Sequence, residues 1–413
     1  MSIPATRSEC ATRDARDPLA RYRGEFTLEP GLIYLDGNSL GALTQRAAAR
    51  VKSMLEREWG QDLIRSWNKH GWFDLPATLG ARIAPLVGAA ADEVLVADST
   101  SVNIFKLVAA LLPLRGERRR IVTEQGNFPT DLYVLQSLAA VSGGALEVLE
   151  LPRAEIAAAI DPTTLLVLLT HVHYKTAEVF DMAAITARAH AAGARILWDL
   201  SHSVGALPVE LGAHRVDLAV GCTYKYLNGG PGSPAFLYVR RDLQDSLRPA
   251  LAGWMGHAAP FEFGDAYRPA AGISRHRCGT PSLLSFAALD GALAAIADLD
   301  LRQVREKSVA LTELFIARVE SLGPATGLTL ASPRNPDARG SHVSFTHPHG
   351  LGLMQALIER GVIGDFRAPD IVRFGFTPLY LRYVDVWDAV DALAAVLAGG
   401  TAPLAAARAA AVT

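Results

Sequence analysis

Residues 165–169 read Leu-Leu-Val-Leu-Leu, so every position of this run is apolar. A strand with one face in water alternates apolar and polar residues, whereas a continuous apolar run predicts a strand buried on both faces. Strands of that kind belong to mostly parallel sheets covered by helices on both sides. This run ends at Thr170, and further β-type runs lie at 94–97, 120–123, 146–149, 194–198, 218–222 and 235–240.

Helical patterns separate these runs. They lie at 103–112, 131–140 and 182–192, and Gly193 is a plausible stop for the last one. This alternation predicts an α/β fold with a mostly parallel, doubly wound sheet. After about Ser285 the pattern changes to a smaller α+β lobe, with helices expected at 285–297, 301–322, 351–360 and 384–397 and strands at 328–331, 342–345 and 371–376.

The expected organisation is a large domain at 61–284 and a small C-terminal domain at 285–413, preceded by an N-terminal segment. That segment, residues 1–60, is expected to pack on the small domain or at a subunit interface. It contains an amphipathic helix at 43–59 that Thr44 can cap. The alanine-rich stretch 402–412 is expected to be a frayed helix or disordered.

Composition narrows the possible partners and compartment. The chain has 413 residues, 50% of them hydrophobic and 20% charged, with a formal net charge of −2. That balance favours neither nucleic acid nor an anionic membrane, and no apolar run is long enough to span a bilayer. The N-terminus shows no signal-peptide pattern. Cys10, Cys222 and Cys278 are too widely spaced for a disulfide framework or metal motif, so we expect a cytoplasmic protein.

Two strand ends carry the residues that pyridoxal 5′-phosphate (PLP) chemistry requires. Lys225 follows the run 218–222 and precedes a glycine-rich turn, while Asp199 ends the run 194–198. A lysine amine can form a Schiff base with the cofactor, and a carboxylate can keep its pyridine nitrogen protonated. Each residue also has a simpler interpretation: Lys225 as a solvated turn lysine, and Asp199 as the partner of a structural arginine. Their pairing in an α/β chain favours PLP.

Other strand ends add compatible groups, because ligands of open α/β sheets lie beyond the carboxyl ends of the strands. Thr100 and Ser101 begin a helix and could hold a phosphate, or the segment could simply cap that helix. Phe128 could stack on a planar ring near Asp131, or mark a surface turn at Pro129. A last group of polar residues comprises Thr170, His171, His173 and His202. His202 could bond the cofactor or cap a helix, and the other two histidines lack metal-ligand spacing, so no metal is expected.

Eight segments, in order, resemble the bacterial kynureninases. The similarity runs from about Gly31 to Leu397, and the most specific pair is YKYLNGGPG at 224–232 with RFGFTPLY at 373–380. The other six are YLDGNSLGAL (34–43), LIRSWNKHGW (63–72), NFPTDLY (127–133), WDLSHSVGALPV (198–209), GWMGH (253–257) and RGSHVSF (339–345). One departure is Ser99, where bacterial relatives often have threonine, and it keeps the hydroxyl.

The resemblance implies a homodimeric fold-type I PLP enzyme of the class V aminotransferase-like group. It would hydrolyse L-kynurenine, and possibly 3-hydroxykynurenine, to anthranilate and L-alanine in tryptophan catabolism. Trp67 stands where animal members tend to have histidine, which favours L-kynurenine.

The resemblance also implies residue roles. Lys225 would bind the cofactor covalently and take the substrate's α-proton, Tyr224 would shuttle protons, and Arg373 would clamp the α-carboxylate through a bidentate fork. Asn38, Ser39 and Trp67 would border the substrate's aromatic end. Cofactor contacts would come from Thr100, Ser101, Phe128, Asp131, Thr170, Asp199, His202 and Tyr224, and from Trp254 and Thr280 of the partner subunit.

Other functions share this scaffold. A cysteine desulfurase or selenocysteine lyase needs a reactive cysteine on a mobile loop, and neither Cys222 nor Cys278 lies on a convincing one. An aminotransferase would use the same cofactor and would respond to a 2-oxo acid. A PLP-binding regulator would need a DNA-binding module, for which the roughly thirty residues before Gly31 leave little room. A catalytically silent homologue would be expected to lack Lys225 or Arg373.

Overall fold

The computed structural model describes residues 3–399, so the alanine-rich stretch at 402–412 lies outside the described residues. Its centre is a seven-stranded sheet in the order β2-β8-β7-β6-β5-β3-β4. The strands are β2 (Val94–Val96), β3 (Arg120–Glu124), β4 (Glu147–Leu151), β5 (Thr164–Thr170), β6 (Arg195–Asp199), β7 (Leu218–Gly221) and β8 (Phe236–Val239).

All neighbouring strands of this sheet are parallel except those that pair with β8, which runs antiparallel to β2 and β7. Every residue of β5 is buried, as its apolar run predicts. The mostly parallel sheet is therefore confirmed, and β8 enters it antiparallel after the glycine-rich turn.

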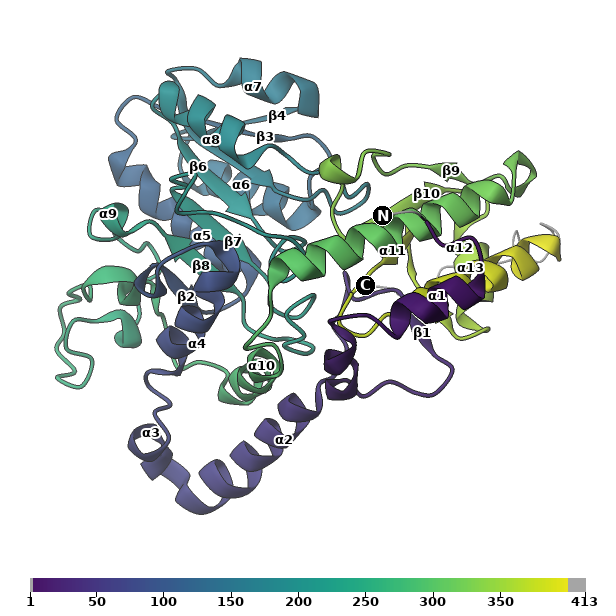
Figure 1. The fold of residues 1–413 in the computed structure, drawn as a ribbon. Coiled ribbons are helices and arrows are strands. Elements are labelled where there is room, and N and C mark those ends of the chain that lie inside the picture. Colours follow the sequence, from purple (N-terminus) through teal and green to yellow (C-terminus); the bar gives the residue numbers. More distant parts are fainter. Residues whose placement is uncertain (1–2, 400–413) are drawn as a thin grey trace.

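Helices cover both faces of the large sheet (Figure 1). On one face, α5 and α6 supply side chains such as Leu107 and Leu135 to a core that also contains Leu166. On the other face, α4 and α8 contribute Leu79 and Met182 to a second core. The helices of this part of the chain are α4 (Leu75–Ile83), α5 (Thr100–Leu111), α6 (Pro129–Val141), α7 (Ile156–Ala159), α8 (Met182–Ala191) and α9 (Arg241–Gln244).

The C-terminal part forms the smaller α+β unit. Its four-stranded sheet has the order β12-β13-β10-β9 and is antiparallel throughout. The strands are β9 (Thr329–Leu330), β10 (His342–Thr346), β12 (Asp365–Arg367) and β13 (Ile371–Gly375). The helices are α10 (Leu283–Ala295), α11 (Leu301–Ser321), α12 (Gly350–Ile358) and α13 (Tyr383–Ala398).

The N-terminal segment lies against this smaller unit. Helix α1 (Arg7–Asp14) packs beside α13, where Asp14 accepts a hydrogen bond from the backbone of Tyr383 at 2.7 Å (Figure 1). Strand β1 (Ile33–Tyr34) pairs in parallel with β11 (Val362–Ile363). The division into an N-terminal segment, a large domain and a small domain, with boundaries at 60/61 and 284/285, stays a prediction.

The predicted helix at 43–59 begins as expected but is not α-helical throughout. Thr44 caps α2 (Gln45–Ser53) by accepting a hydrogen bond from the Ala47 N–H at 3.1 Å. The chain then continues as a π-helical segment, η2 (Met54–Asp62), ahead of the short α3 (Ser66–Lys69). Within it, Glu58 is buried and accepts hydrogen bonds from Arg50 at 2.5 Å and from Trp72 Nε1 at 2.7 Å. These contacts hold the wider turn.

The topology places the functional strand ends together. Because β2, β3, β5, β6 and β7 all run in the same direction, the residues that follow each of them reach the same edge of the sheet. None of the helices within residues 3–399 is long and apolar enough to cross a membrane.

Candidate active site

Lys225 lies at this edge, four residues after β7 ends at Gly221. Its side chain is buried, and its Nζ lies 3.3 Å from His202 Nε2. Burial lowers the pKa of the Lys225 ammonium, which favours the neutral, nucleophilic amine. Gly41 approaches the same turn so closely that a Cβ there would lie 2.2 Å from the Lys225 carbonyl oxygen. The N-terminal segment therefore fixes the backbone that carries the lysine.

Asp199, the last residue of β6, and Asp131, in the first turn of α6, form a pair of buried carboxyl groups. Burial raises the pKa of Asp131 well above its ordinary value, and the negative charge of Asp199 raises it further. Burial also raises the pKa of Asp199, although a hydrogen bond from the Ser201 N–H at 2.7 Å opposes that shift. Thr170 donates to Asp131 at 3.1 Å. No arginine contact to Asp199 is found within residues 3–399.

The amino end of α5 faces the same edge from β2. Ser99 caps the helix by accepting a hydrogen bond from the Val102 N–H at 3.3 Å, and Thr100 and Ser101 are its first two residues. Asp98, just before the cap, has a φ of 47° and pairs with the buried Lys106 at 2.6 Å. Hydroxyls and free N–H groups at a helix start suit a phosphate. The cap predicted as the simpler alternative is present too, on Ser99.

A cavity of about 710 Å³ opens beside Lys225. Phe128 stands at its edge, 40% exposed, with its ring centroid 5.9 Å from Lys225 Nζ. Tyr174 meets Phe128 in a T-shaped contact, with ring centroids 5.3 Å apart, and both rings line the cavity. The residues that line the cavity are Asn38, Ser39, Leu40, Phe128, Pro129, Tyr174, Lys175, His202, Tyr224, Lys225, Pro231, Arg367, Ala368 and Arg373.

Arg373 reaches this cavity from β13. However, two of the guanidinium N–H groups that could hold a ligand carboxylate already bond to Asp365. Arg373 Nε donates to Asp365 Oδ1 at 2.8 Å, and its Nη2 donates to the other Asp365 oxygen. The same Nη2 lies 2.8 Å from the Ser39 hydroxyl. Sequence reasoning missed Asp365 and its neighbour Arg367, because nothing in the run GDFR at 364–367 shows that β12 pairs with β13.

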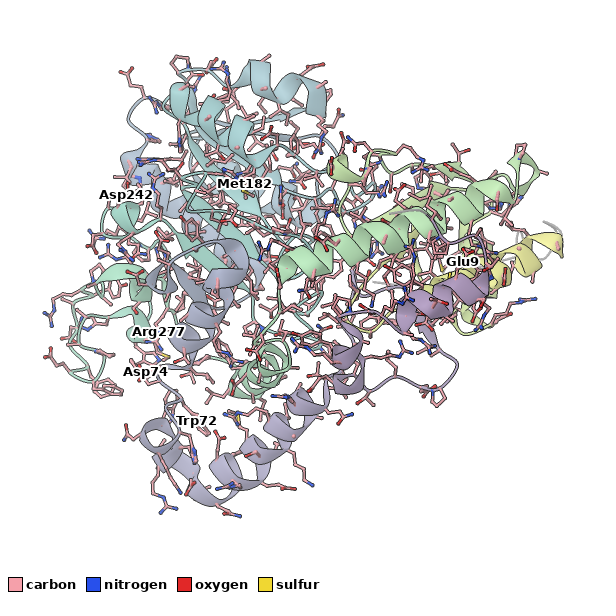
Figure 2. All side chains as sticks on the ribbon, viewed as in Figure 1. Glu9, Trp72, Asp74, Met182, Asp242 and Arg277 are labelled. Carbon is pink, nitrogen blue, oxygen red and sulfur yellow. The ribbon has the colours of Figure 1, made fainter. Side chains whose placement is uncertain are left out.

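Three predicted residues lie away from the lysine cavity of the chain. Trp67 and Trp254 pack against each other, with ring centroids 6.4 Å apart. Phe73 joins this aromatic group, and Arg277 lies over the Phe73 ring at 4.4 Å (Figure 2, near the labelled Trp72 and Asp74). Thr280 lines a second cavity, of about 320 Å³, with Asp98. Within a single chain, Trp67, Trp254 and Thr280 therefore do not line the cavity at Lys225.

The two histidines after β5 have other partners. His171 Nδ1 lies 2.9 Å from the Ser203 hydroxyl, and His173 Nε2 lies 3.2 Å from the Gly126 carbonyl oxygen. Across residues 3–399, no group of three or more His, Cys, Asp or Glu side chains is placed to hold a metal ion.

The site fits PLP on its own chemistry. Asp131 Oδ1 is buried without a hydrogen-bond partner among the described residues, beside a second buried carboxyl group. Two carboxyl groups in that position need a proton or a cationic N–H, which a pyridinium supplies. The Lys225 amine can react with the aldehyde of PLP. The aromatic face of Phe128 can stack on its ring, and the start of α5 can bind its phosphate.

The chain is similar to known proteins over most of its length. The family model of the kynureninase C-terminal domain matches residues 304–393. Curated kynureninases from Burkholderia mallei (strain SAVP1) and Pseudomonas fluorescens are each 50% identical over 398 residues, which is 95% of this chain and 95% of each relative.

Solved structures with the same fold are more distant in sequence. The cysteine desulfurase CsdA from Escherichia coli has a TM-score of 0.77 at 19% identity, covering 92% of this chain and 98% of its own. The cystine C-S lyase C-DES, in a form with glycine covalently linked to its PLP cofactor, has a TM-score of 0.77 at 20% identity, covering 91% and 98%. The fold is therefore that of the fold-type I PLP enzymes, and the near full-length identity to curated relatives shows that the chain belongs to the kynureninase family.

Proposed function

We propose that this protein is a PLP-dependent hydrolase that converts L-kynurenine and water to anthranilate and L-alanine in tryptophan catabolism. The observation that carries the proposal is the position of Lys225, a buried amine at the sheet edge that faces a pair of buried carboxyl groups. The identity to curated kynureninases supports the choice of substrate.

The residues divide the work of holding the cofactor. Lys225 would bind it covalently, Asp199 with Asp131 would hold the pyridine nitrogen, and Phe128 would stack on the ring. Thr100, Ser101 and Tyr224 would bind the phosphate, with Thr170 and His202 bordering the ring. When bound, PLP supplies an electron sink that stabilises negative charge at the substrate's α-carbon.

Proton movement at the substrate's carbon atoms falls to Lys225 and Tyr224, which both line the cavity. Because burial lowers its pKa, the Lys225 amine can accept the α-proton. The nearby Cys222 and burial together raise the pKa of the Tyr224 phenol, so Tyr224 holds its proton and can act as an acid. Water attacks the γ-carbonyl carbon, and the Cβ–Cγ bond breaks so that the water oxygen becomes part of the anthranilate carboxyl group. Protonation of the β-carbon and return of a proton to the α-carbon then complete L-alanine.

The cysteine chemistry of a desulfurase has little support here, although solved desulfurases share the fold. Burial raises the pKa of the thiols of both Cys222 and Cys278, which disfavours the reactive thiolate. Cys222 is fully enclosed at the end of β7, where its Sγ lies 3.8 Å from the Ser201 carbonyl oxygen. Cys278 is half-buried in an irregular stretch beside the second cavity, and neither thiol lines the cavity at Lys225.

We infer that the enzyme is a homodimer whose two chains share each active site. Trp254, Phe261 and Phe263 form an exposed aromatic group, with 37%, 64% and 77% exposure. Such a patch suits an interface with a second copy of the chain. In that arrangement Trp254 and Thr280 of one chain would reach the cofactor phosphate of the other, and Trp67 would border the substrate's aromatic end.

Mixing two inactive variants tests the shared site. Lys225→Ala removes the lysine, and Trp254→Ala removes the ring that would serve the partner's site. A mixed dimer would contain one site with an intact lysine from one chain and an intact tryptophan from the other. Activity should therefore return when the two variants are unfolded and refolded together, but not when each is refolded alone. No recovery in mixed dimers would contradict the shared site.

We also propose a cytoplasmic location. Cys10, Cys222 and Cys278 are all free thiols, as expected in a reducing compartment. Fractionation of the source cells with an antibody to the chain would test this, and recovery in a secreted fraction would contradict it.

The activity itself is tested by recording the visible spectrum of the purified protein while following anthranilate fluorescence after addition of L-kynurenine. A lysine-bound cofactor band together with growing anthranilate emission is the expected result. A cofactor band without anthranilate would overturn the choice of substrate and keep the PLP site. Parallel assays with 3-hydroxykynurenine measure the preference attributed to Trp67, and a 2-oxo acid tests for aminotransferase activity.

A further inference from the structure

The cavity beside Lys225 is lined by two arginines, not only by the predicted Arg373. Arg373 lies on β13 and is almost fully buried, whereas the side chain of Arg367, at the end of the neighbouring β12, keeps 20% exposure. Both residues therefore come from the small sheet and reach the cavity side by side. A substrate that enters this cavity meets two guanidinium groups.

The hydrogen bonds of Arg373 limit what it can offer to a ligand. A guanidinium has five N–H donors. In Arg373, Nε and one N–H of Nη2 serve Asp365, the other N–H of Nη2 serves the Ser39 hydroxyl, and Nη1 donates to the Tyr174 carbonyl oxygen at 2.5 Å. Within residues 3–399, only one N–H, on Nη1, is left without such a bond. A bidentate grip by Arg373 alone would therefore require breaking its contact with Asp365 or Ser39.

Asp365 joins the two arginines. Its Oδ2 lies 2.8 Å from Arg367 Nη2 and also accepts from Arg373. Burial alone would raise the pKa of Asp365, but the charges of Arg373 and Arg367 hold that pKa below its ordinary value. Asp365 is thus ionised and balances one of the two positive charges. The two arginines thus carry one more positive charge than Asp365 balances, which suits a carboxylate ligand while the nearby Asp36 is protonated.

Ser39 completes the group. Its hydroxyl donates to Asp365 Oδ2 at 2.6 Å and lies within 3.3 Å of Arg367 Nη2. Two guanidiniums, one carboxylate and one hydroxyl thus form a connected network at the cavity wall. Such a network holds the guanidinium planes of both arginines in fixed orientations, which reduces the entropy lost when a ligand binds to them.

We propose that Arg367 is a second binding residue for the α-carboxylate of the amino-acid substrate. Arg373 contributes its remaining Nη1 donor, Arg367 contributes its positive charge at the cavity wall, and Asp365 acts as the positioning residue that orients both. This proposal rests on the proposed function, since it concerns the substrate of that reaction. The specificity it predicts is for an α-amino acid over the corresponding amine that lacks the carboxylate.

Binding measurements on the PLP-loaded protein test this without turnover. L-Alanine and the decarboxylated amine of kynurenine are each titrated into wild type and Arg367→Gln, and binding is read from the visible spectrum. Loss of the Arg367 positive charge should weaken L-alanine binding about tenfold or more in Arg367→Gln. Binding of the amine should change by less than about twofold, since the amine has no carboxylate.

Two further variants calibrate the result. Arg367→Lys keeps the charge without the planar fork and should recover part of the L-alanine affinity. Arg360→Gln removes an exposed arginine just after α12, whose Nη1 donates to the Ala356 carbonyl oxygen of that helix at 3.2 Å, and should behave as wild type.

Unchanged L-alanine affinity in Arg367→Gln would overturn the proposal, and so would an equal loss for both ligands, which would mark Arg367 as structural. A wild-type protein that binds L-alanine but releases no anthranilate would instead contradict the proposed function alone.

Discussion

Lys225 Nζ lies 3.3 Å from His202 Nε2, and both groups are buried. Burial lowers the pKa of each, and the charge of Lys225 lowers the pKa of His202 further. Both shifts favour the uncharged forms of the two groups, an amine and an imidazole. This contact keeps the amine reactive while the histidine remains able to hydrogen-bond to a cofactor oxygen.

Replacement of Lys225 by alanine should abolish turnover while the fold remains intact. The loss should be at least the roughly 10²–10⁴-fold contribution of a positioned acid–base group, because the amine also holds the cofactor. Anthranilate release measures turnover, and circular dichroism checks the fold. Lys52→Ala, at an exposed lysine 3.9 Å from Glu56, is the matched control. Near wild-type turnover in Lys225→Ala would refute the assignment.

Replacement by asparagine should have different effects on activity at Asp199 and at Asp131. Asp199→Asn should lower kcat/KM by about 10²-fold or more, because it removes the anion that keeps the pyridine nitrogen protonated. Asp131→Asn should cost far less, since burial and the charge of Asp199 raise the pKa of Asp131 and favour its neutral form, which an amide resembles. Steady-state kinetics at saturating PLP decide the order. A larger loss in Asp131→Asn would reverse the two roles.

Much of this site was predictable from local sequence. Strand ends set the positions of Asp199, Thr170 and Lys225, because a buried apolar run and the residue that follows it are neighbours in the chain. Parallel strands then bring these residues to one edge. The order of the predicted strands and helices followed for the same reason, but short elements such as α1, α4, β1, β11 and β12 were not predicted.

The carboxylate-binding wall was only partly predictable, because its contacts are long-range. Arg373 was recognised only through family resemblance, while Asp365 and Arg367 belong to a three-residue strand with no periodicity to read. Ser39 reaches Asp365 across 326 residues of sequence. The π-helical segment after α2 was likewise hidden, since it depends on the buried Glu58 and its partner Trp72.

Substrate affinity should depend on pH through Asp36. Burial and the negative charge of Asp365 raise the pKa of Asp36 to about 7, while Arg373 opposes the shift. Above that pH, Asp36 gains a negative charge beside the carboxylate-binding arginines. KM for L-kynurenine should therefore rise severalfold between about pH 6 and about pH 8, with kcat changing less. Asp36→Asn should flatten this KM profile, and an unchanged profile in that variant would assign the titration elsewhere.

The free energy of unfolding should also depend on pH through Asp36, and the direction of this dependence follows from its raised pKa. The folded-state pKa of Asp36 lies above its ordinary value of 3.8, so the folded protein binds more protons than the unfolded chain between about pH 4 and about pH 7. The cost of burying Asp36 therefore grows as pH rises through that window. Asp36→Asn should be more stable than wild type by about 2–4 kcal/mol at pH 8, and the gain should vanish near pH 4. Urea denaturation at both pH values measures it, and a constant difference would contradict the assignment.

Lys106 should control cofactor affinity from behind the phosphate-binding turn. It is fully buried in α5, and its Nζ holds the Asp98 carboxylate at 2.6 Å, directly before the helix start. Asp98 has a φ of 47°, a conformation that a non-glycine residue adopts only when its surroundings hold it. Lys106→Met keeps the apolar stem but frees the turn, so the start of α5 loses its fixed orientation.

In Lys106→Met the apoprotein should bind PLP about tenfold more weakly, while kcat at saturating PLP stays near wild type. Titration of the apoprotein with PLP, followed by its absorbance, gives the affinity. Lys69→Met is the control, because Lys69 is an exposed lysine with an equally close carboxylate partner, Asp62 at 2.8 Å. Unchanged PLP affinity would show that the capped helix holds the turn without Lys106. A fall in kcat at saturating PLP would show that the substitution disturbs the reacting groups themselves.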